Sequence, residues 1–192
     1  PFTSDVAAFA QRTLCGNGSI TAHVTSINGS GWAGIVMRES SAPGAKKAQL
    51  LTNLGNFHRR EFRTTTNGAA QPQQSASNGR YWLRITRTGN QFNMFVSQNG
   101  MSWISAGSQN IIMDNCIQIG LVASNYTANS TVTATFAGVS FTSSNPTSGT
   151  NINEVAESIE APYSFEVYPN PTNGELNIDL TQYIGRSVRM EM

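Results

Sequence analysis

Between residues 80 and 103, apolar side chains recur at every second position, first over residues 81–86 and again over residues 92–96. A period of two is typical of strands that bury one face. Gly89-Asn90 and Asn99-Gly100 interrupt the two runs, and the second pair predicts a tight type I′ hairpin turn. The segment therefore predicts two antiparallel strands and the start of a third. The apolar face of such a sheet needs a second layer to cover it.

Strand-like patterns continue through most of the first 141 residues. Further strands are predicted at residues 20–27, 32–39, 48–53, 57–65, 116–124 and 131–141. The second of these has a continuous apolar centre, which indicates burial on both faces. Residues 67–79, rich in Gln, Ser and Ala, are predicted to form a loop. No segment has the 3.6-residue period of a helix, and about nine short strands predict an all-β antiparallel sandwich.

A change of charge divides the chain. Residues 1–141 carry ten basic and four acidic side chains, whereas residues 142–192 carry two basic and seven acidic ones. Residues 142–163 are rich in Ser, Asn, Thr and Glu, as expected of a flexible acidic linker. Alternation resumes at residue 164, and the turn-forming stretch 169–174 predicts a hairpin that opens a second β unit over residues 164–192. We therefore expect a sandwich domain, a linker and the start of a second domain.

The charge and hydropathy of the chain limit its partners. The positive charge of residues 1–141 fits either a solvated surface or a patch for an anionic polysaccharide. No nucleic-acid-binding motif accompanies that charge, so a nucleic-acid partner is not predicted. The chain has no apolar run of 18 residues and is not expected to span a membrane. Pro1-Phe2-Thr3 is unlike a natural start and indicates a cut inside a longer precursor.

Acidic residues are too sparse for hydrolytic chemistry. A glycosidase needs two carboxylates that flank the scissile bond, one as proton donor and one as base or nucleophile. The first 141 residues offer four carboxylates, none spaced two or four residues from another. Two of these, Glu39 and Glu61, stand beside arginines and are expected to form ion pairs. The isolated His23 and His58 predict no metal centre and no cofactor, with a structural calcium ion as the alternative.

The aromatic and sulfur-containing residues offer two further features. Trp32, Trp82 and Trp103 are candidate stacking rings for a sugar, with Arg38 or Arg84 as the hydrogen-bond donor. Trp82 with Arg84 is the leading pair, because the two share one face of the same predicted strand. The alternative is that these rings are buried in the core. Burial is the favoured interpretation for Trp32 and Trp103, whereas for Trp82 burial and sugar binding are equally supported. Cys15 and Cys116 are the only cysteines. They are predicted to form a disulfide in an exported protein, with two buried thiols as the alternative.

Four blocks of the sandwich region resemble a bacterial domain family of the concanavalin A-like lectin/glucanase superfamily. They are residues 16–22, 32–40, 81–90 and 133–141. The resemblance covers residues 2–141 and implies a jelly-roll sandwich. Domains similar to this are appended to secreted polysaccharide-active enzymes and to large surface proteins. The resemblance implies no particular ligand. Together with the sparse carboxylates, it leads us to expect a non-catalytic carbohydrate-binding or adhesive module. An accessory domain of an enzyme whose catalytic part precedes residue 1, or a structural spacer, are the alternatives.

The second β unit resembles the start of the C-terminal sorting domain of the type IX secretion system of Bacteroidetes. Its motif residues are Tyr168, Pro169, Asn170, Pro171 and Gly174. Later strands of that domain are missing, so we expect a truncated copy. The resemblance implies export through the periplasm and outer membrane to the cell surface or medium. The implied partners are the outer-membrane translocon and its shuttle barrel protein.

Overall fold

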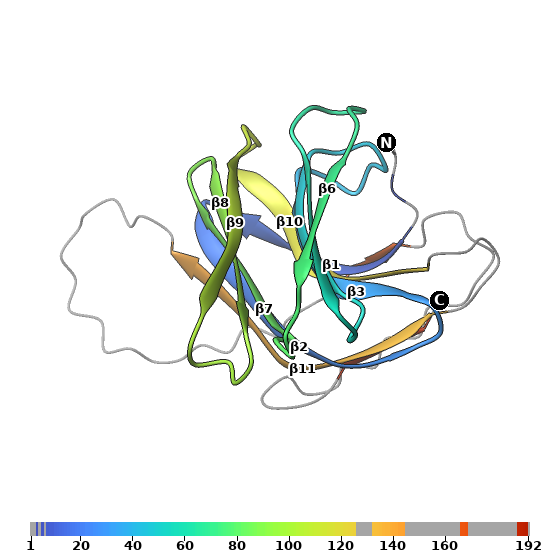
Figure 1. The fold of residues 1–192 in the computed structure, drawn as a ribbon. Coiled ribbons are helices and arrows are strands. Elements are labelled where there is room, and N and C mark those ends of the chain that lie inside the picture. The colour runs from blue at the N-terminus through green and yellow to red at the C-terminus, as the bar shows by residue number, and fades with distance from the viewer. Residues whose placement is uncertain are drawn as a thin grey trace.

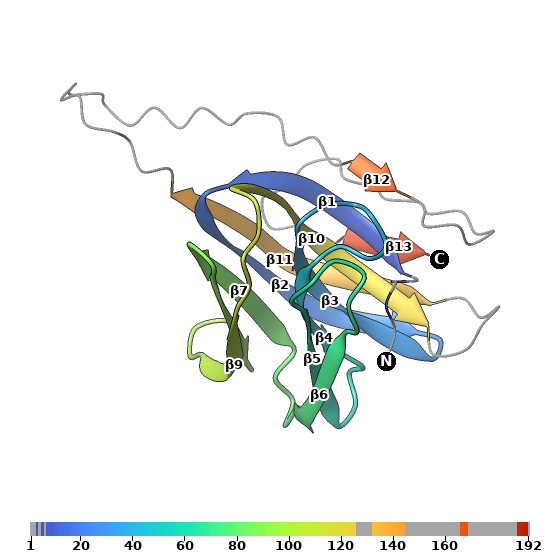
Figure 2. The same ribbon diagram turned by 90° about the horizontal axis from the view of Figure 1, so that it is seen from above.

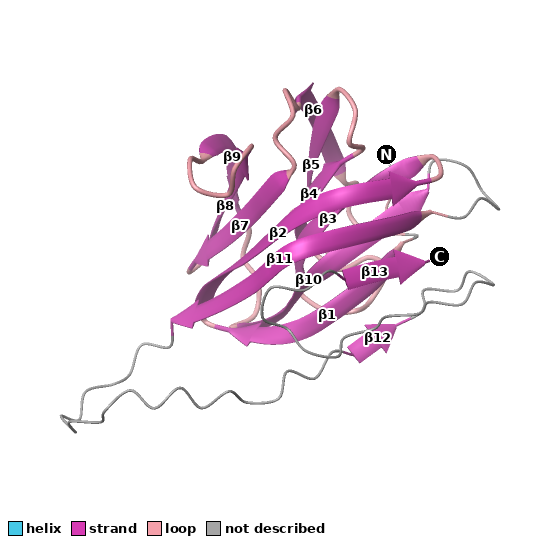
Figure 3. Cartoon of the chain, turned by 90° about the horizontal axis from the view of Figure 1, so that it is seen from below, coloured by secondary structure: helices cyan, strands magenta, loops and turns pink. Residues whose placement is uncertain are grey.

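The computed structural model describes Thr3, Asp5 and residues 7–125, 132–144, 166–168 and 188–191. Every regular element in these ranges is a β-strand (Figure 3). The strands form two antiparallel sheets that pack face to face (Figure 1). The predicted all-β antiparallel sandwich is confirmed. Within the same ranges, no helix has the length and apolar character needed to cross a membrane.

The two sheets contain seven and six strands. Across the first sheet the order is β12 (Glu166–Tyr168), β1 (Ala8–Cys15), β10 (Cys116–Asn125), β3 (Gly31–Arg38), β4 (Lys47–Thr52), β5 (Phe57–Arg63) and β6 (Gln71–Ala76). Across the second it is β13 (Val188–Glu191), β11 (Thr133–Ser144), β2 (Asn17–Asn28), β7 (Trp82–Thr88), β8 (Gln91–Ser97) and β9 (Ile104–Asn110). The predicted central hairpin is therefore the pair β7–β8.

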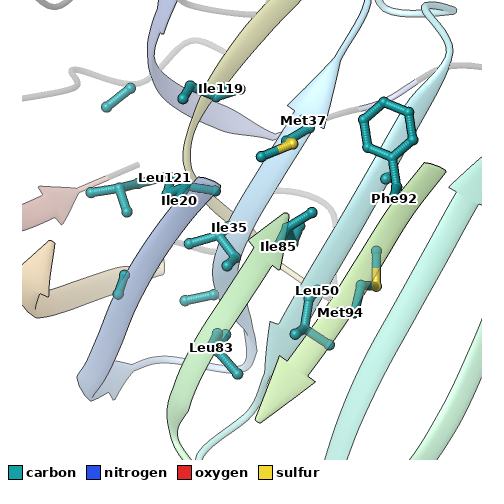
Figure 4. Close-up of a cluster of buried hydrophobic side chains, with 14 of the residues drawn as sticks. Ile20, Ile35, Met37, Leu50, Leu83, Ile85, Phe92, Met94, Ile119 and Leu121 are labelled. Carbon is teal, nitrogen blue, oxygen red and sulfur yellow. The ribbon is translucent and has the colours of Figure 1, made fainter. Parts of the chain in front are cut away.

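The main core lies between the two sheets. Figure 4 shows side chains from both sheets pointing toward one another, among them Ile35 and Leu50 from one sheet and Leu83 and Met94 from the other. All four are fully buried, and burying each such side chain stabilises the fold by about 1.5–3 kcal/mol. Because side chains alternate along a strand, burying Leu83 on β7 turns its neighbours Trp82 and Arg84 to the opposite face.

A second apolar cluster covers the other face of the seven-stranded sheet. Its members are Ala7, Phe9, Trp32, Val36, Leu51 and Val122. As a result β3 is buried along its whole length. This confirms the burial on both faces that the apolar centre of residues 32–39 predicts.

Two strands lack a sequence signal. β6 lies inside residues 67–79, for which we predicted a loop, and all its side chains are exposed. A strand without a buried face has no apolar alternation to detect. β1 has the opposite property, because both of its faces are buried over its first half. Both segments are strands because their backbones pair with a neighbouring strand, and neither has an amphipathic pattern along its whole length.

The turn after β8 differs from the predicted type I′ hairpin. β8 ends at Ser97 and β9 begins only at Ile104. Gly100 has a positive φ of 74°, but Asn99 does not, and a type I′ turn requires positive φ at both central residues. Instead the Asn99 side-chain oxygen accepts the backbone N–H groups of Met101 and Ser102, each at 2.9 Å. The longer turn brings Trp103 back over the sheet.

The C-terminal part of the chain adds to the sandwich edges where it is described. β11 continues to Ser144, past the expected domain boundary at residue 141. Of residues 164–192, β12 pairs with β1 and β13 pairs with β11 (Figure 2). The described strands of this segment thus extend the two sheets. The linker from residue 145 onward lies outside the described residues.

Candidate ligand-binding surface

The outer face of the six-stranded sheet carries the candidate pair Trp82 and Arg84. Both project from β7 on the side away from the core. The pairing of β2 with β7 places His23 opposite Trp82 and Thr21 opposite Arg84. We refer to this area, together with Trp103, as the β7 surface.

Trp82 is packed between protein groups. The His23 ring stacks on it with centroids 4.8 Å apart and planes 4° apart. A Cβ added at Gly100 would lie 3.1 Å from the indole ring, and one added at Gly138 would lie 2.4 Å from it. Because β2 and the β8–β9 turn lie on opposite sides of β7, the indole has a neighbour on each face. Trp82 therefore has no free face for a sugar ring and serves the packing of this surface.

Arg84 is held in a fixed position over Trp103. Its guanidinium carbon lies 3.9 Å from the centre of the Trp103 ring, and its Nε donates a 3.0 Å hydrogen bond to Thr21 Oγ1. Partial burial lowers the pKa of Arg84, yet a guanidinium stays charged at neutral pH. Its terminal nitrogens have no hydrogen-bond partner among the described residues. The β7 surface thus presents an oriented donor beside a half-exposed ring.

Trp32 and Arg38 lie on the other sheet and do not join the β7 surface. Trp32 is 3% exposed and belongs to the second apolar cluster. Arg38 is 1% exposed, with its Nη2 donating 2.6 Å to the backbone oxygen of Ala42 and its guanidinium 4.4 Å from the Phe9 ring. Neither side chain is accessible to a ligand. Burial therefore excludes Trp32 and Arg38 as ligand-binding residues. The second apolar cluster packs on this face of β3.

Two buried carboxylates share a single ammonium group. Lys47 Nζ lies 2.8 Å from Asp5 Oδ1 and 2.5 Å from Glu61 Oε1. Burial raises the pKa of Asp5, but the hydrogen bonds and charges of Arg63 and Lys47 outweigh burial and lower it overall. A glycosidase acid needs the opposite shift, so that it still holds a proton at neutral pH. This carboxylate pair does not fit that role.

The other acidic and histidine residues form no metal centre. Glu39 forms the expected ion pair, but its partner is Lys46 Nζ at 2.8 Å and not the neighbouring Arg38. No group of three His, Cys, Asp or Glu side chains gathers as metal ligands anywhere in the described ranges.

Cys15 and Cys116 form a disulfide. They lie directly opposite each other where β1 and β10 pair. The sorting motif is described only at Tyr168, which ends β12 and pairs with Phe9 of β1. Its residues Pro169, Asn170, Pro171 and Gly174 lie outside the described residues.

His58 makes the fold sensitive to acid. It is 2% exposed, and its Nε2 contacts the backbone oxygen of Arg80. Burial lowers the pKa of His58, an effect that the Arg80 carbonyl partly offsets. The unfolded chain, with a histidine pKa of about 6.5, then binds more protons than the folded chain below that pH. Stability is therefore full above about pH 6.5 and decreases as the pH falls below it.

Urea denaturation between pH 7.5 and 5 measures this effect. We expect the free energy of unfolding to fall with pH in the natural chain and to fall less steeply in the His58→Gln variant. Since burial also lowers the pKa of His23, part of the slope should persist. An identical slope in both proteins would contradict the role of His58.

The comparisons with known proteins support the fold and do not name a family. No protein-family model matches the chain, and no curated protein matches it. Among solved structures, one match is described as the crystal structure of a functionally unknown protein from Saccharomyces cerevisiae. It has a TM-score of 0.57 and 18% sequence identity, and the match covers 73% of this chain and 77% of the yeast chain. This likeness shows a shared fold and nothing about activity.

Proposed function

We propose that the chain is a non-catalytic, extracellular glycan-binding module of the concanavalin A-like type, and that the β7 surface holds its ligand. The observation that carries this proposal is the Arg84–Trp103 pair. Arg84 is oriented by Thr21 and by the indole ring, while its terminal nitrogens lack a partner among the described residues. A preorganised guanidinium beside an aromatic ring suits a saccharide, which offers both hydroxyl acceptors and an apolar ring face.

Polar side chains extend this surface on the neighbouring strand. Asn93 and Phe95 lie on β8 opposite Thr86 and Arg84 and are half-buried. An amide and a third aromatic ring thus lie on the same face as Arg84. The absence of a suitable carboxylate pair among the described residues agrees with a binding role.

A glycan array followed by titration tests the proposal. We expect the natural chain to bind a glycan and the Arg84→Gln variant to bind it about tenfold or more weakly, because hydrogen bonds to a charged group contribute about 1.5–3 kcal/mol. Arg80→Gln removes the same charge from the loop before β7 and serves as the matched control. Binding that Arg80→Gln weakens as much as Arg84→Gln would indicate general charge attraction. No binding on the array would favour a structural spacer.

Export by the type IX secretion system is the second proposed function. It is supported by the sequence from Tyr168 to Pro171 and by the acidic linker. The disulfide is a further support, because disulfides persist in oxidising compartments such as the periplasm and the cell exterior. The receptor side is the outer-membrane translocon with its shuttle barrel protein. The sandwich is then the exported cargo, adhesive on its own or accessory to a polysaccharide-degrading enzyme.

A reporter fusion tests the export proposal. Residues 142 to the native C-terminus, joined to a fluorescent protein in a host with this system, should carry the reporter to the medium or cell surface. Replacing Pro169 and Pro171 with Ala should reduce export, since these prolines fix the backbone of the turn. Reporter that stays in the periplasm with the complete tail attached would rule out the sorting role.

A further inference from the structure

A polar cleft opens at the edge of the sandwich and is lined by residues of both sheets. The edge strand β6 of one sheet and the edge strand β9 of the other stand on its two sides (Figure 1). The cleft has a volume of about 380 Å³ and is lined by Arg60, Gln73, Ser75, Ser105 and the segment 106–107. This volume is at the low end of the range of roughly 300–1,000 Å³ typical of ligand sites.

Arg60 is the cation of this cleft and is held from both sheets. Its Nε donates a 2.9 Å hydrogen bond to Gln73 Oε1 on β6. Its Nη1 donates a 2.5 Å hydrogen bond to the backbone oxygen of Ala106 on β9. The Gln73 oxygen also accepts from Nη2. Both sheets therefore fix the guanidinium in one orientation before any ligand arrives.

The local structure of β9 makes room for this guanidinium. Met94 pairs with Gly107 and Phe95 with Ser105, so Ala106 is an extra residue in a β-bulge. The bulge turns the Ala106 carbonyl toward Arg60. A Cβ at Gly107 would lie 2.1 Å from Arg60 Nη1, and Gly107 has a φ of 128°. Only glycine fits this position, which indicates a site shaped around the guanidinium.

The positive charge of Arg60 has no acidic partner among the described residues. None of its lining residues is acidic, and Arg60 takes part in none of the ion pairs formed within the described ranges. Three of its five N–H groups are used on Gln73 and Ala106. The other two have no partner in that part of the chain. An anionic group therefore complements this cleft better than a neutral one.

We infer that the cleft binds the carboxylate of a uronic acid residue in an acidic polysaccharide. The carboxylate accepts hydrogen bonds from the unused N–H groups of Arg60, as guanidinium–carboxylate pairs commonly do. Ser75, Ser105 and Gln73 also line the cleft, and their polar side chains are of the kind that hydrogen-bond the hydroxyls of a sugar. This inference rests on the proposed glycan-binding function and adds the acidic class of ligand and a second contact site.

Titration of the full chain with an oligogalacturonate and with its methyl ester tests the inference. The ester removes the negative charge and keeps the sugar. We expect the acid to bind about tenfold or more tightly than the ester, given the strength of charge-assisted hydrogen bonds. Arg60→Gln should abolish that difference. Ser75→Phe, at an exposed position of β6, should fill the cleft and weaken binding with Arg60 in place, which keeps the test valid if Arg60→Gln does not fold.

The possible outcomes separate this inference from the proposed function. Equal binding of acid and ester, or a preference that survives Arg60→Gln, overturns the uronate site. Competition by acetate at the same concentration as the oligosaccharide overturns it too, since that would show a general anion site. If Arg84→Gln still weakens glycan binding in those cases, the proposed function stands. A chain that binds no glycan overturns both.

Discussion

Replacing Asp5 with Asn should lower the free energy of unfolding by about 3–5 kcal/mol, the usual cost of removing one partner from a buried ion pair. The Asp5 side chain is 6% exposed and lies 2.8 Å from Lys47 Nζ and 2.8 Å from Arg63 Nη2. Arg38 Nη2 lies 3.5 Å from Asp5 Oδ2, and the Arg38 side chain is also buried. Asn keeps the shape and removes the charge, so three buried cations lose an anion. Chemical denaturation at pH 7 measures the loss.

A matched control comes from the half-buried pair of Glu39 and Lys46. Glu39→Gln also removes one charge from an ion pair, but that pair is partly open to solvent and should contribute less than about 1 kcal/mol. The effect of Asp5→Asn should also depend on pH. The lowered pKa of Asp5 means that its contribution is full above about pH 3.9 and is lost as the pH falls through the folded-state value. Equal losses for the two variants would contradict the buried network.

Removing the disulfide should lower the free energy of unfolding by a similar amount. Cys15 and Cys116 are 101 residues apart in sequence, and a closed loop of about 100 residues contributes about 4.7 kcal/mol in the loop-entropy model. Both positions lie at the ends of paired strands and are half-buried or exposed. The double variant Cys15→Ser and Cys116→Ser should therefore unfold more easily without a cavity in the core.

Urea denaturation of the double variant, beside the natural chain with and without reductant, measures this contribution. The reduced natural chain should match the double variant within the error of the extrapolation. A loss below about 1 kcal/mol would show that the bond does not constrain the unfolded chain as the loop-entropy model requires. A reduced chain much less stable than the double variant would instead indicate that the two free thiols disturb the pairing of β1 with β10.

Three of the ten basic side chains in residues 1–141 are buried in ion pairs, which neither sequence hypothesis contained. Arg38, Lys47 and Arg63 are buried with Asp5 and Glu61. All three cations pair with Asp5 near the N-terminus. Because they are buried, they are not available as a surface patch for a ligand. The charge count of a sequence does not reveal which cations are internal, because internal pairing depends on contacts between distant segments.

The alternation of β7 predicted that Trp82 and Arg84 share one face, but it left open whether that face is buried. The neighbours of these two side chains depend on long-range pairing. His23 reaches Trp82 only through the register of β2 with β7. Trp103 reaches Arg84 because the turn after β8 is longer than the Asn-Gly pair suggested. Alternation within one strand predicts faces, whereas register and turn length select the residues that meet on them.

The three indole N–H signals in a two-dimensional NMR spectrum test the location of the ligand most directly. Trp32, Trp82 and Trp103 are the only tryptophans, and each occupies a different environment. On titration with a glycan identified by the array, Trp103 should shift most, because it lies against Arg84 on the β7 surface. Trp82 should shift less, and the buried Trp32 should stay unchanged. A saturable shift confined to Trp32, or bound ligand with no shift of Trp103, would contradict the assignment of the β7 surface as the glycan site.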